Sequence, residues 1–445
     1  MINPDIFKAY DIRGTYPDQL NEDAAYAIGA AAVVHFGVDT IAVGRDMRLS
    51  SPQIFEALTK GVTAQGASVV DLGMTSTDEL YFAVGKYGYP AGCMITASHN
   101  PAQYNGIKFC LAGAVPVSSQ TGLDDIKKIV VAGVPAPKEK QGTIEHRDVL
   151  KDFVTHVHTF IDPAKLKSLK VAVDGGNGMA GTIVPAAFSG LPVTIEPLYF
   201  EPDGHFPHHP ASPIEPENMV DVQKLVRESH ADLGAAFDGD ADRVFIVDEK
   251  GDLVDGSMVT AMVARALLKK NPGSAILYNL IVSKCVPELV ERLGGKPVRT
   301  RVGHSFIKAQ MRENDAIFGG EHSGHFYFRD NFFADSGLIA LMVVLEVVSE
   351  ENKPVSEIVA SLCTRKRSGE INSEVKDIPS KLAELRDRYK DGEEDQLDGI
   401  TVSYPDWWFN VRASNTEPLL RLNVEADSRE LMEQKRDELL AVIRE

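Results

Sequence analysis

Three carboxylates at alternate positions of one short segment are the most informative chemical feature of the sequence. Asp238, Asp240 and Asp242 lie within residues 238–243, between two apolar runs. Carboxylates this close repel one another unless a cation lies among them, and all-oxygen ligation suits a hard ion such as Mg²⁺. A calcium EF-hand is excluded because the sixth position of that loop needs glycine and here is Arg243. The segment therefore predicts a magnesium site, with an acidic surface turn as the alternative.

A serine in a tight polar loop after an apolar strand is the second feature. Residues 93–96 lead into residues 97–101, which carry Ser98. A serine displayed at a sheet edge can act as a nucleophile or carry a phosphoryl group. A hydrolase triad fits poorly, because Ser98 lacks the Gly-x-Ser-x-Gly elbow and the adjacent His99 cannot easily reach it as a base. A plain Asn-Pro turn is the alternative interpretation.

Two further polar loops have the groups needed to bind a sugar phosphate. Glu321, Ser323 and His325 alternate within residues 320–325, and a carboxylate beside a hydroxyl is a natural acceptor pair for vicinal sugar hydroxyls. Residues 412–418 combine a guanidinium, two hydroxyls and an amide, which is the inventory needed to hold a phosphate dianion. Ordinary turns are the alternative at both places. The groups of the second loop belong to Arg412, Ser414, Asn415 and Thr416.

A glycine-rich segment gives a competing signal. Residues 176–181 follow a predicted strand at 170–174 and match G-x-G-x-x-G, the dinucleotide-binding fingerprint. The helix expected after them is short and contains Pro185. We interpret the segment as a glycine turn that packs a helix against a strand, and a nicotinamide-dependent oxidoreductase remains the alternative from a different class.

Composition and charge restrict the class of protein. The chain has 445 residues, of which 44% are hydrophobic and 25% charged, as in soluble globular proteins. Its formal net charge of −18 argues against binding to nucleic acid or to an anionic membrane. The longest apolar runs, such as residues 338–345, are too short to span a bilayer, and the N-terminus has no signal pattern. We expect a cytoplasmic protein whose four widely spaced cysteines are reduced thiols: Cys93, Cys110, Cys285 and Cys363.

The elements that must position these loops alternate between strand-like and helix-like patterns through about residue 365. This alternation predicts three similar α/β domains with mixed, mostly parallel sheets, followed by a smaller C-terminal α+β domain, around a central cleft. The expected bounds are 1–141, 142–250, 251–365 and 366–445. Three of the polar loops directly follow apolar strands, and open α/β sheets bind ligands beyond the carboxyl ends of their strands. We therefore expect these loops to converge.

In this order, the motifs resemble the α-D-phosphohexomutase superfamily, specifically its phosphomannomutase/phosphoglucomutase branch. The resemblance spans nearly the whole chain and begins at residues 8–14, which read KAYDIRG. It implies that Ser98 carries a phosphoryl group and that Mg²⁺ is bound by Asp238, Asp240, Asp242 and a phosphate oxygen on Ser98. It also implies that residues 320–325 bind the sugar hydroxyls and that residues 412–418 bind the phosphate that is not being transferred.

The implied reaction interconverts hexose 6-phosphate and hexose 1-phosphate, with mannose or glucose as the sugar, through a hexose 1,6-bisphosphate that also recharges Ser98. Phosphoryl transfer needs positioning and charge neutralisation, to which Arg13, Lys108 and Arg243 would contribute beside Mg²⁺. Arg13, Lys108 and His325 are the candidates for general acid or base, and the sequence does not rank them. The expected substrate-binding residues, some taken only from matching family positions, are Tyr10, His99, Arg243, Lys284, His304, Glu321, Ser323, His325, Arg412, Ser414, Asn415 and Thr416.

Two further functions stay open at this stage. A phosphoglucosamine mutase of the same superfamily is disfavoured by Tyr10 in the opening motif, because that branch is expected to have a Thr-Asp-Gly form there. A non-enzymatic module that binds sugar phosphates is the weaker option. The sequence predicts neither the sugar epimer, since His322 stands where Met or Gln is expected in relatives, nor the oligomeric state.

Overall fold

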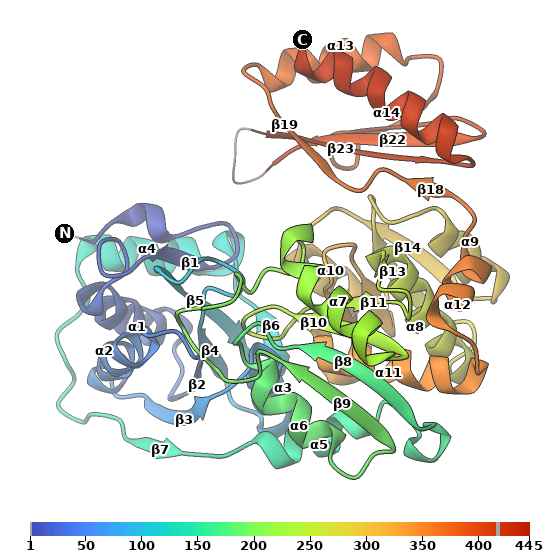
Figure 1. Ribbon diagram of the computed structural model, residues 1–445. Helices are drawn as coiled ribbons and strands as arrows, with labels where there is room; N and C mark the ends of the chain where they lie inside the picture. Colours follow the sequence, from blue (N-terminus) through green and yellow to red (C-terminus); the bar gives the residue numbers. More distant parts are fainter. Residues whose placement is uncertain (1, 415–418) are drawn as a thin grey trace.

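The computed structural model describes residues 2–414 and 419–445. Four sheets organise this part of the chain, each covered by its own helices (Figure 1). The fourth sheet lies apart from the other three, above β13 (Ala275–Asn279), β14 (Lys296–Thr300) and helix α9 (Cys285–Arg292) (Figure 1). The expected architecture of three α/β units and a smaller α+β unit is confirmed.

The first sheet has the order β1–β5–β4–β2–β3–β7, with β6 paired to β5. Strand β7 pairs with β3 and so joins the first sheet, although it lies beyond residue 141, the expected end of the first domain. Helices α1 and α2 pack so closely that a Cβ on Gly29 would lie 2.2 Å from the carbonyl oxygen of Leu58. The strands are β1 (Ile12–Thr15), β2 (Thr40–Arg45), β3 (Ser68–Met74), β4 (Ala91–Ile95), β5 (Tyr104–Leu111), β6 (Val115–Pro116) and β7 (Ile144–His146), and the helices are α1 (Glu22–Phe36), α2 (Ser51–Ala64), α3 (Thr77–Tyr87) and α4 (Leu123–Ala132).

The second and third sheets share one topology. Their orders are β9–β8–β10–β11–β12 and β14–β13–β15–β16–β17. The second unit contains β8 (Leu169–Asp174), β9 (Val193–Leu198), β10 (Leu233–Phe237), β11 (Val244–Val247), β12 (Leu253–Val254), α5 (Leu150–His158), α6 (Ala180–Phe188) and α7 (Val220–Ser229). The third contains β13 (Ala275–Asn279), β14 (Lys296–Thr300), β15 (Phe318–Gly320), β16 (Phe326–Phe328), β17 (Ala334–Asp335), α8 (Gly256–Lys270), α9 (Cys285–Arg292), α10 (His304–Glu313), α11 (Gly337–Glu351) and α12 (Val355–Leu362).

Strands β4, β10 and β15 occupy the same place in their three sheets. Each has a parallel neighbour on one side and an antiparallel neighbour on the other. Parallel and antiparallel pairings are equally frequent in each of these sheets, so the sheets are mixed and not mostly parallel as expected. An antiparallel pair arises in each sheet because the chain reverses after the polar loop, so that the next strand pairs with the central one as a hairpin.

The fourth sheet is antiparallel, with the order β18–β23–β22–β21–β20 and β19 paired to β23. Strands β21, β22 and β23 are consecutive neighbours in this sheet. Its elements are β18 (Lys366–Arg367), β19 (Ile371–Glu374), β20 (Glu393–Asp395), β21 (Ile400–Ser403), β22 (Trp407–Ala413), β23 (Leu419–Ala426), α13 (Ile378–Arg388) and α14 (Arg429–Arg444). Short 3₁₀ turns elsewhere are η1 (Pro4–Ile6), η2 (Ala112–Ala114), η3 (Ser119–Thr121), η4 (Pro163–Lys165), η5 (Pro216–Met219) and η6 (Arg329–Asn331).

The hydrophobic cores follow the sheets with one exception. The first and fourth units have cores of their own, whereas one continuous core joins the second and third units and also includes Met47 and Phe82 of the first. Helix α11 makes this junction, because thirteen of its fifteen residues are buried. Among the described residues, no helix is both long and apolar enough to cross a membrane.

The expectation of four reduced thiols is wrong for two of the cysteines. Cys285 and Cys363 form a disulfide, with their Cα atoms 5.6 Å apart. Cys285 begins α9 and Cys363 directly follows α12, so the fold brings together two residues that are 78 positions apart in the chain. Cys93 and Cys110 are buried free thiols, and burial raises the pKa of Cys110 to about 12.

Candidate functional site

The loop after β4 displays Ser98 against the second domain. Ser98 has a left-handed φ of 49° and is 1% exposed. Its backbone N–H donates to Thr96 Oγ1 at 2.8 Å, which closes the loop locally. Its hydroxyl donates to Asp238 Oδ2 at 2.7 Å. The first two predicted motifs, 140 residues apart, therefore meet at hydrogen-bonding distance.

The three carboxylates of the loop after β10 form one buried cluster. Asp238, Asp240 and Asp242 are at most 3% exposed, and each offers an oxygen within 4.8 Å of the others. Asp240 Oδ1 and Asp242 Oδ1 are buried and accept no hydrogen bond from any residue within the described ranges. Buried carboxylate oxygens without donors are costly. The donor set and its unfilled acceptors therefore fit a hard divalent cation.

Lys108, from β5, neutralises part of this cluster. Its ammonium group lies 2.8 Å from Asp240 Oδ2 and 3.0 Å from Asp242 Oδ2. Burial by itself lowers the pKa of Lys108, but these two carboxylates outweigh it and hold the pKa well above its usual value. Burial likewise raises the pKa of Asp240, yet Lys108 brings it below the usual value. Lys108 is thus a fixed cation in this arrangement.

Arg243 and His99 border the cluster on the serine side. Arg243 Nε lies 3.4 Å from Asp238 Oδ2, and Arg243 Nη2 donates to His99 Nδ1 at 2.7 Å. The Arg243 guanidinium, followed by burial, holds the pKa of His99 well below its usual value. Burial, followed by the neighbouring carboxylates, raises the pKa of Asp238 well above its usual value. Contrary to expectation, His99 does reach the serine, since its Nδ1 lies 3.1 Å from Ser98 Oγ. Because the same nitrogen accepts from Arg243, His99 is still unsuited to take a proton from Ser98.

The loop between β15 and β16 brings its three polar side chains together, as the alternating pattern predicted. Ser323 Oγ donates to Glu321 Oε2 at 3.2 Å and lies 3.1 Å from His325 Nδ1. The other ring nitrogen of His325 lies 3.8 Å from Asp242 Oδ1. A backbone bridge between Arg243 and His325 joins this loop to the carboxylate loop. The three loops thus converge on one site.

The opening motif lies at the edge of this site. Arg13 donates to the side chains of Asn100 and Asp11, so it is tied to the serine loop. Tyr10 and Lys108 line the same small cavity of about 20 Å³. Burial, the largest influence, raises the pKa of Tyr10.

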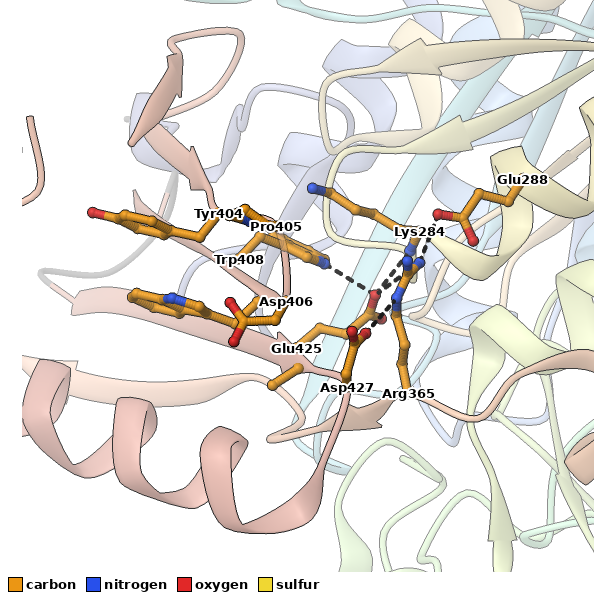
Figure 2. A pocket seen from close by; sticks show the side chains of 11 residues that line it. Lys284, Glu288, Arg365, Tyr404, Pro405, Asp406, Trp408, Glu425 and Asp427 are labelled. Carbon is orange, nitrogen blue, oxygen red and sulfur yellow. Dashed lines mark hydrogen bonds and ion pairs between the residues drawn. The ribbon is translucent and has the colours of Figure 1, made fainter. Parts of the chain in front are cut away.

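Lys284 lies apart from these loops, in a cavity of about 180 Å³ between the third and fourth domains (Figure 2). Its Nζ donates to Ser403 Oγ at 3.0 Å and its backbone N–H donates to Glu425 Oε1 at 3.1 Å. Arg365 Nη1 lies 4.0 Å from the same carboxylate oxygen, and Figure 2 shows the Lys284 ammonium group pointing away from Glu425. No contact joins Lys284 to the converged loops within the described part of the chain.

The predicted phosphate loop is engaged within its own domain. Arg412 Nη2 lies 2.8 Å from Glu370 Oε2, and Arg421 Nη1 lies 3.1 Å from Glu370 Oε1. The backbone N–H of Ser414 donates to the carbonyl of Leu419 at 2.9 Å. Asn415 and Thr416 lie outside the described residues, as does the side chain of His304, whose backbone begins α10.

The glycine-rich segment binds protein and not a dinucleotide. A Cβ on Gly178 would lie 2.6 Å from the carbonyl oxygen of Gly239, and one on Gly181 would lie 1.8 Å from that of Phe200. The space that a pyrophosphate needs is therefore occupied by main chain. This agrees with the interpretation of a packing turn.

Sequence reasoning missed two residues that contact the site. Thr77, at the start of α3, donates its hydroxyl to Asp240 Oδ2 at 2.6 Å and its N–H to the Asp240 carbonyl at 3.1 Å. Asp335 Oδ2 lies 3.9 Å from His325 Nε2, while Asp335 Oδ1 lies 2.6 Å from the buried Lys308. The capping pattern at residues 76–79 indicates a helix start, but nothing local indicates that this start faces the carboxylate loop.

Comparison with known proteins gives full-length matches. Four domain families described as phosphoglucomutase/phosphomannomutase match in order: alpha/beta/alpha domain I at residues 4–137, domain II at 151–251, domain III at 255–365 and the C-terminal domain at 370–442. A phosphomannomutase of Escherichia coli is 40% identical over 451 residues, which cover 98% of this chain and 99% of that protein. A protein of Xanthomonas campestris pv. campestris named phosphohexose mutases is 41% identical, covering 94% of each chain.

Solved structures agree with these relatives. A phosphoglucomutase/phosphomannomutase family protein from Burkholderia thailandensis superposes with a TM-score of 0.89 at 33% identity, over 99% of this chain and 97% of that one. A structure described as a putative phosphomannomutase from Thermus thermophilus has a TM-score of 0.84 at 25% identity, over 99% and 100% of the two chains. Both the sequence and the arrangement of its four sheets place this chain in the phosphoglucomutase/phosphomannomutase family of enzymes.

Proposed function

We propose that this protein is a phosphohexomutase that interconverts hexose 6-phosphate and hexose 1-phosphate, with mannose or glucose as the sugar. The observation that carries the proposal is the 2.7 Å contact between the Ser98 hydroxyl and a buried cluster of three carboxylates. Curated relatives that span nearly the whole chain are named phosphomannomutase and phosphohexose mutases. Ser98 is then the carrier of the phosphoryl group.

The metal of this reaction would be Mg²⁺, held by Asp238, Asp240, Asp242 and an oxygen on Ser98. When bound, such an ion neutralises charge on the transferring phosphoryl group. The unfilled buried oxygens of Asp240 and Asp242 support this assignment. Arg243 and Arg13 would add positive charge from the serine side.

In the transfer step, the bond between phosphorus and Ser98 Oγ breaks while a sugar hydroxyl forms a new bond to phosphorus. A general base must take the proton of that hydroxyl. His325 is the best of the three candidates, because an arginine stays charged and Lys108 is held as an ammonium ion, whereas the His325 ring can offer an acceptor nitrogen and lies beside Ser323 and Asp242. The resulting bisphosphate turns around, and its other phosphoryl group returns to Ser98.

Substrate recognition is assigned to the remaining predicted residues. Glu321 and Ser323 would accept hydrogen bonds from sugar hydroxyls, and Tyr10 and His99 would make further contacts to the substrate. The fourth domain would hold the non-reacting phosphate through Arg412 and its loop. The ion pair between Arg412 and Glu370 would have to open first. Lys284 and His304 would act when the fourth domain closes. We further propose a cytoplasmic location, together with the four-domain division given above.

The proposal is tested by assays on glucose 1-phosphate and mannose 1-phosphate in the presence of Mg²⁺ and a hexose 1,6-bisphosphate. We expect turnover of both sugars and a mass increase of one phosphoryl group on Ser98. Ser98→Ala should lose nearly all turnover while it retains its fold, and the exposed Ser361→Ala should behave like wild type. A label on another residue, or full activity in excess chelator, would contradict the mechanism.

The same assays separate the alternative within the superfamily. A strong preference for glucosamine 6-phosphate, measured side by side with the two hexose phosphates, would change the assignment to a phosphoglucosamine mutase.

A further inference from the structure

A buried arginine beneath the serine loop has no role in the site described above. Arg48 lies between β2 and α2 and is 1% exposed. Its Nη2 donates to the carbonyls of Ser98 at 2.8 Å and Asn100 at 2.6 Å. Its Nη1 donates to the carbonyls of Pro101 at 2.8 Å and Tyr104 at 2.9 Å.

The fifth donor of the guanidinium is also used. Arg48 Nε donates to Asp46 Oδ2 at 3.1 Å. A guanidinium carries five N–H donors in a rigid planar fork. All five are therefore satisfied, four of them by main-chain carbonyls of the segment that runs from Ser98 to the start of β5.

Asp46 fixes the arginine from the other side. Its Oδ1 accepts from the Arg48 backbone N–H at 3.0 Å and from Ser51 Oγ at 2.6 Å. The second domain closes over this pair: the Phe206 ring centroid lies 5.1 Å from the guanidinium carbon. A Cβ on Gly204 would lie 2.8 Å from Arg48 Cα, so that loop packs directly on the arginine. Bound substrate cannot contact a side chain enclosed in this way.

The serine loop needs such support because its geometry is unfavourable. A non-glycine residue at φ 49° persists only where the surroundings over-determine it. The Ser98 carbonyl also faces Gly239 of the carboxylate loop, where a Cβ would lie 2.5 Å from it. A small rotation of the loop would thus move the Ser98 hydroxyl away from Asp238 and press its main chain against the second domain.

We propose that Arg48 is a positioning residue, which holds the loop of Ser98 in the conformation that gives and receives the phosphoryl group. It acts through four main-chain carbonyls and does not touch the sugar phosphate. The inference rests on the proposed function of Ser98. Lysine cannot replace it, since an ammonium group has three donors and no planar fork.

The test compares Arg48→Lys and Arg48→Met with wild type and with Leu58→Ala, a control that removes a fully buried side chain from α2 of the same domain. Four quantities are measured for each protein: the thermal midpoint, kcat, KM, and the rate at which a hexose 1,6-bisphosphate phosphorylates Ser98, followed by intact mass. Misplacement of a reacting group by about 1 Å costs roughly 100-fold in rate. We expect Arg48→Lys to lose about that factor in both kcat and phosphorylation rate, with KM within about twofold.

The control distinguishes positioning from stability. Leu58→Ala should lower the thermal midpoint but retain kcat for each folded molecule. If the Arg48 variants behave like Leu58→Ala, the inference is overturned and Arg48 only stabilises the domain. If Arg48→Met does not fold, Arg48→Lys decides. Absence of turnover and of phospho-Ser98 in wild type itself would instead contradict the proposed function.

Discussion

The ammonium group of Lys108 lies 2.8 Å from Asp240, within the carboxylate cluster assigned to the metal. It reaches Asp242 at 3.0 Å as well. The carboxylate cluster therefore has a cation of its own even before a metal arrives. A metal ion on the remaining carboxylate oxygens is repelled by this ammonium group, which makes Lys108 a determinant of metal affinity as well as of charge at the site.

The first prediction is that Lys108→Met binds Mg²⁺ more tightly than wild type, because an ammonium group on the same carboxylates no longer repels the metal ion. The metal-free variant should lose about 3 kcal/mol of stability, since removal of one partner leaves buried carboxylates uncompensated. Calorimetric titration with Mg²⁺, with thermal unfolding in chelator, measures both effects. Lys128→Met, which breaks an exposed pair with Asp125, is the control. Equal metal affinity in variant and wild type would show that Lys108 does not weaken metal binding.

The second prediction concerns Glu370 and pH. Burial raises the pKa of Glu370, but His322, Arg412 and Arg421 outweigh it and bring the pKa below its usual value. A lowered pKa contributes stability that is present above the unfolded value near 4.5 and is lost as pH falls through the folded value. Glu370→Gln should therefore be less stable than wild type by about 3 kcal/mol at pH 7, because the buried guanidinium of Arg412 loses this carboxylate.

This difference should shrink steadily below about pH 4.5. Trp407 and Trp408 are the only two tryptophans and both lie in the fourth domain, so fluorescence during urea unfolding reports on that domain alone. Glu384→Gln, on the exposed face of α13, serves as the control. A difference that does not change between pH 7 and pH 3.5 would exclude an ionised Glu370 as the source.

The third prediction is that Arg412→Ala raises KM by roughly 10- to 100-fold, since hydrogen bonds to a charged group contribute about 1.5–3 kcal/mol each. A bisphosphate that is held less tightly should escape before its second transfer. The variant should consequently depend more strongly on added hexose 1,6-bisphosphate. Steady-state assays with and without added bisphosphate measure this, and exposed Arg388→Ala is the control. Unchanged kcat/KM would assign Arg412 to the internal ion pair alone.

The fourth prediction concerns the disulfide. Cys363→Ser opens a loop of 78 residues, and closure of a loop of that length contributes about 2–4 kcal/mol. Reductant should destabilise wild type by the same amount and leave the variant unaffected. Thiol titration of the denatured protein should find two free thiols before reduction and four after it. Four thiols in non-reduced protein would show that the bond does not form in solution.

Much of the site was predictable because its chemistry is local. Each of the first three polar loops follows directly from an apolar strand, and strands at equivalent places of similar sheets end at one cleft. Asp238, Asp240 and Asp242 also have no plausible structural purpose together without a cation. The convergence of the loops and the cation site could therefore both be predicted from residues only a few positions apart.

The remaining features depend on contacts that no local pattern reports. Glu370 contacts Arg412 and Arg421, which lie 42 and 51 positions away in the chain. Nothing in the sequence distinguishes Glu370 from the many other carboxylates that could have made these contacts. Arg48 is separated from Ser98 by 50 positions and looks like an ordinary helix-flanking arginine. The disulfide likewise could not be predicted from local sequence, because only the packing of α9 against the end of α12 brings its cysteines together.

The position of β1 has a consequence for synthesis on the ribosome. Ile12 of β1 pairs with Ile107 of β5, whereas the second and third sheets take their fifth strands, β12 and β17, from residues that follow directly in the chain. The N-terminal strand is made first but must wait until about 100 more residues have emerged before its partner exists. In the second and third sheets, the last strand emerges within a few dozen residues of its hairpin partner. The first domain is therefore the one most exposed to premature pairing while translation continues, and the one for which a pause after β5 would help most.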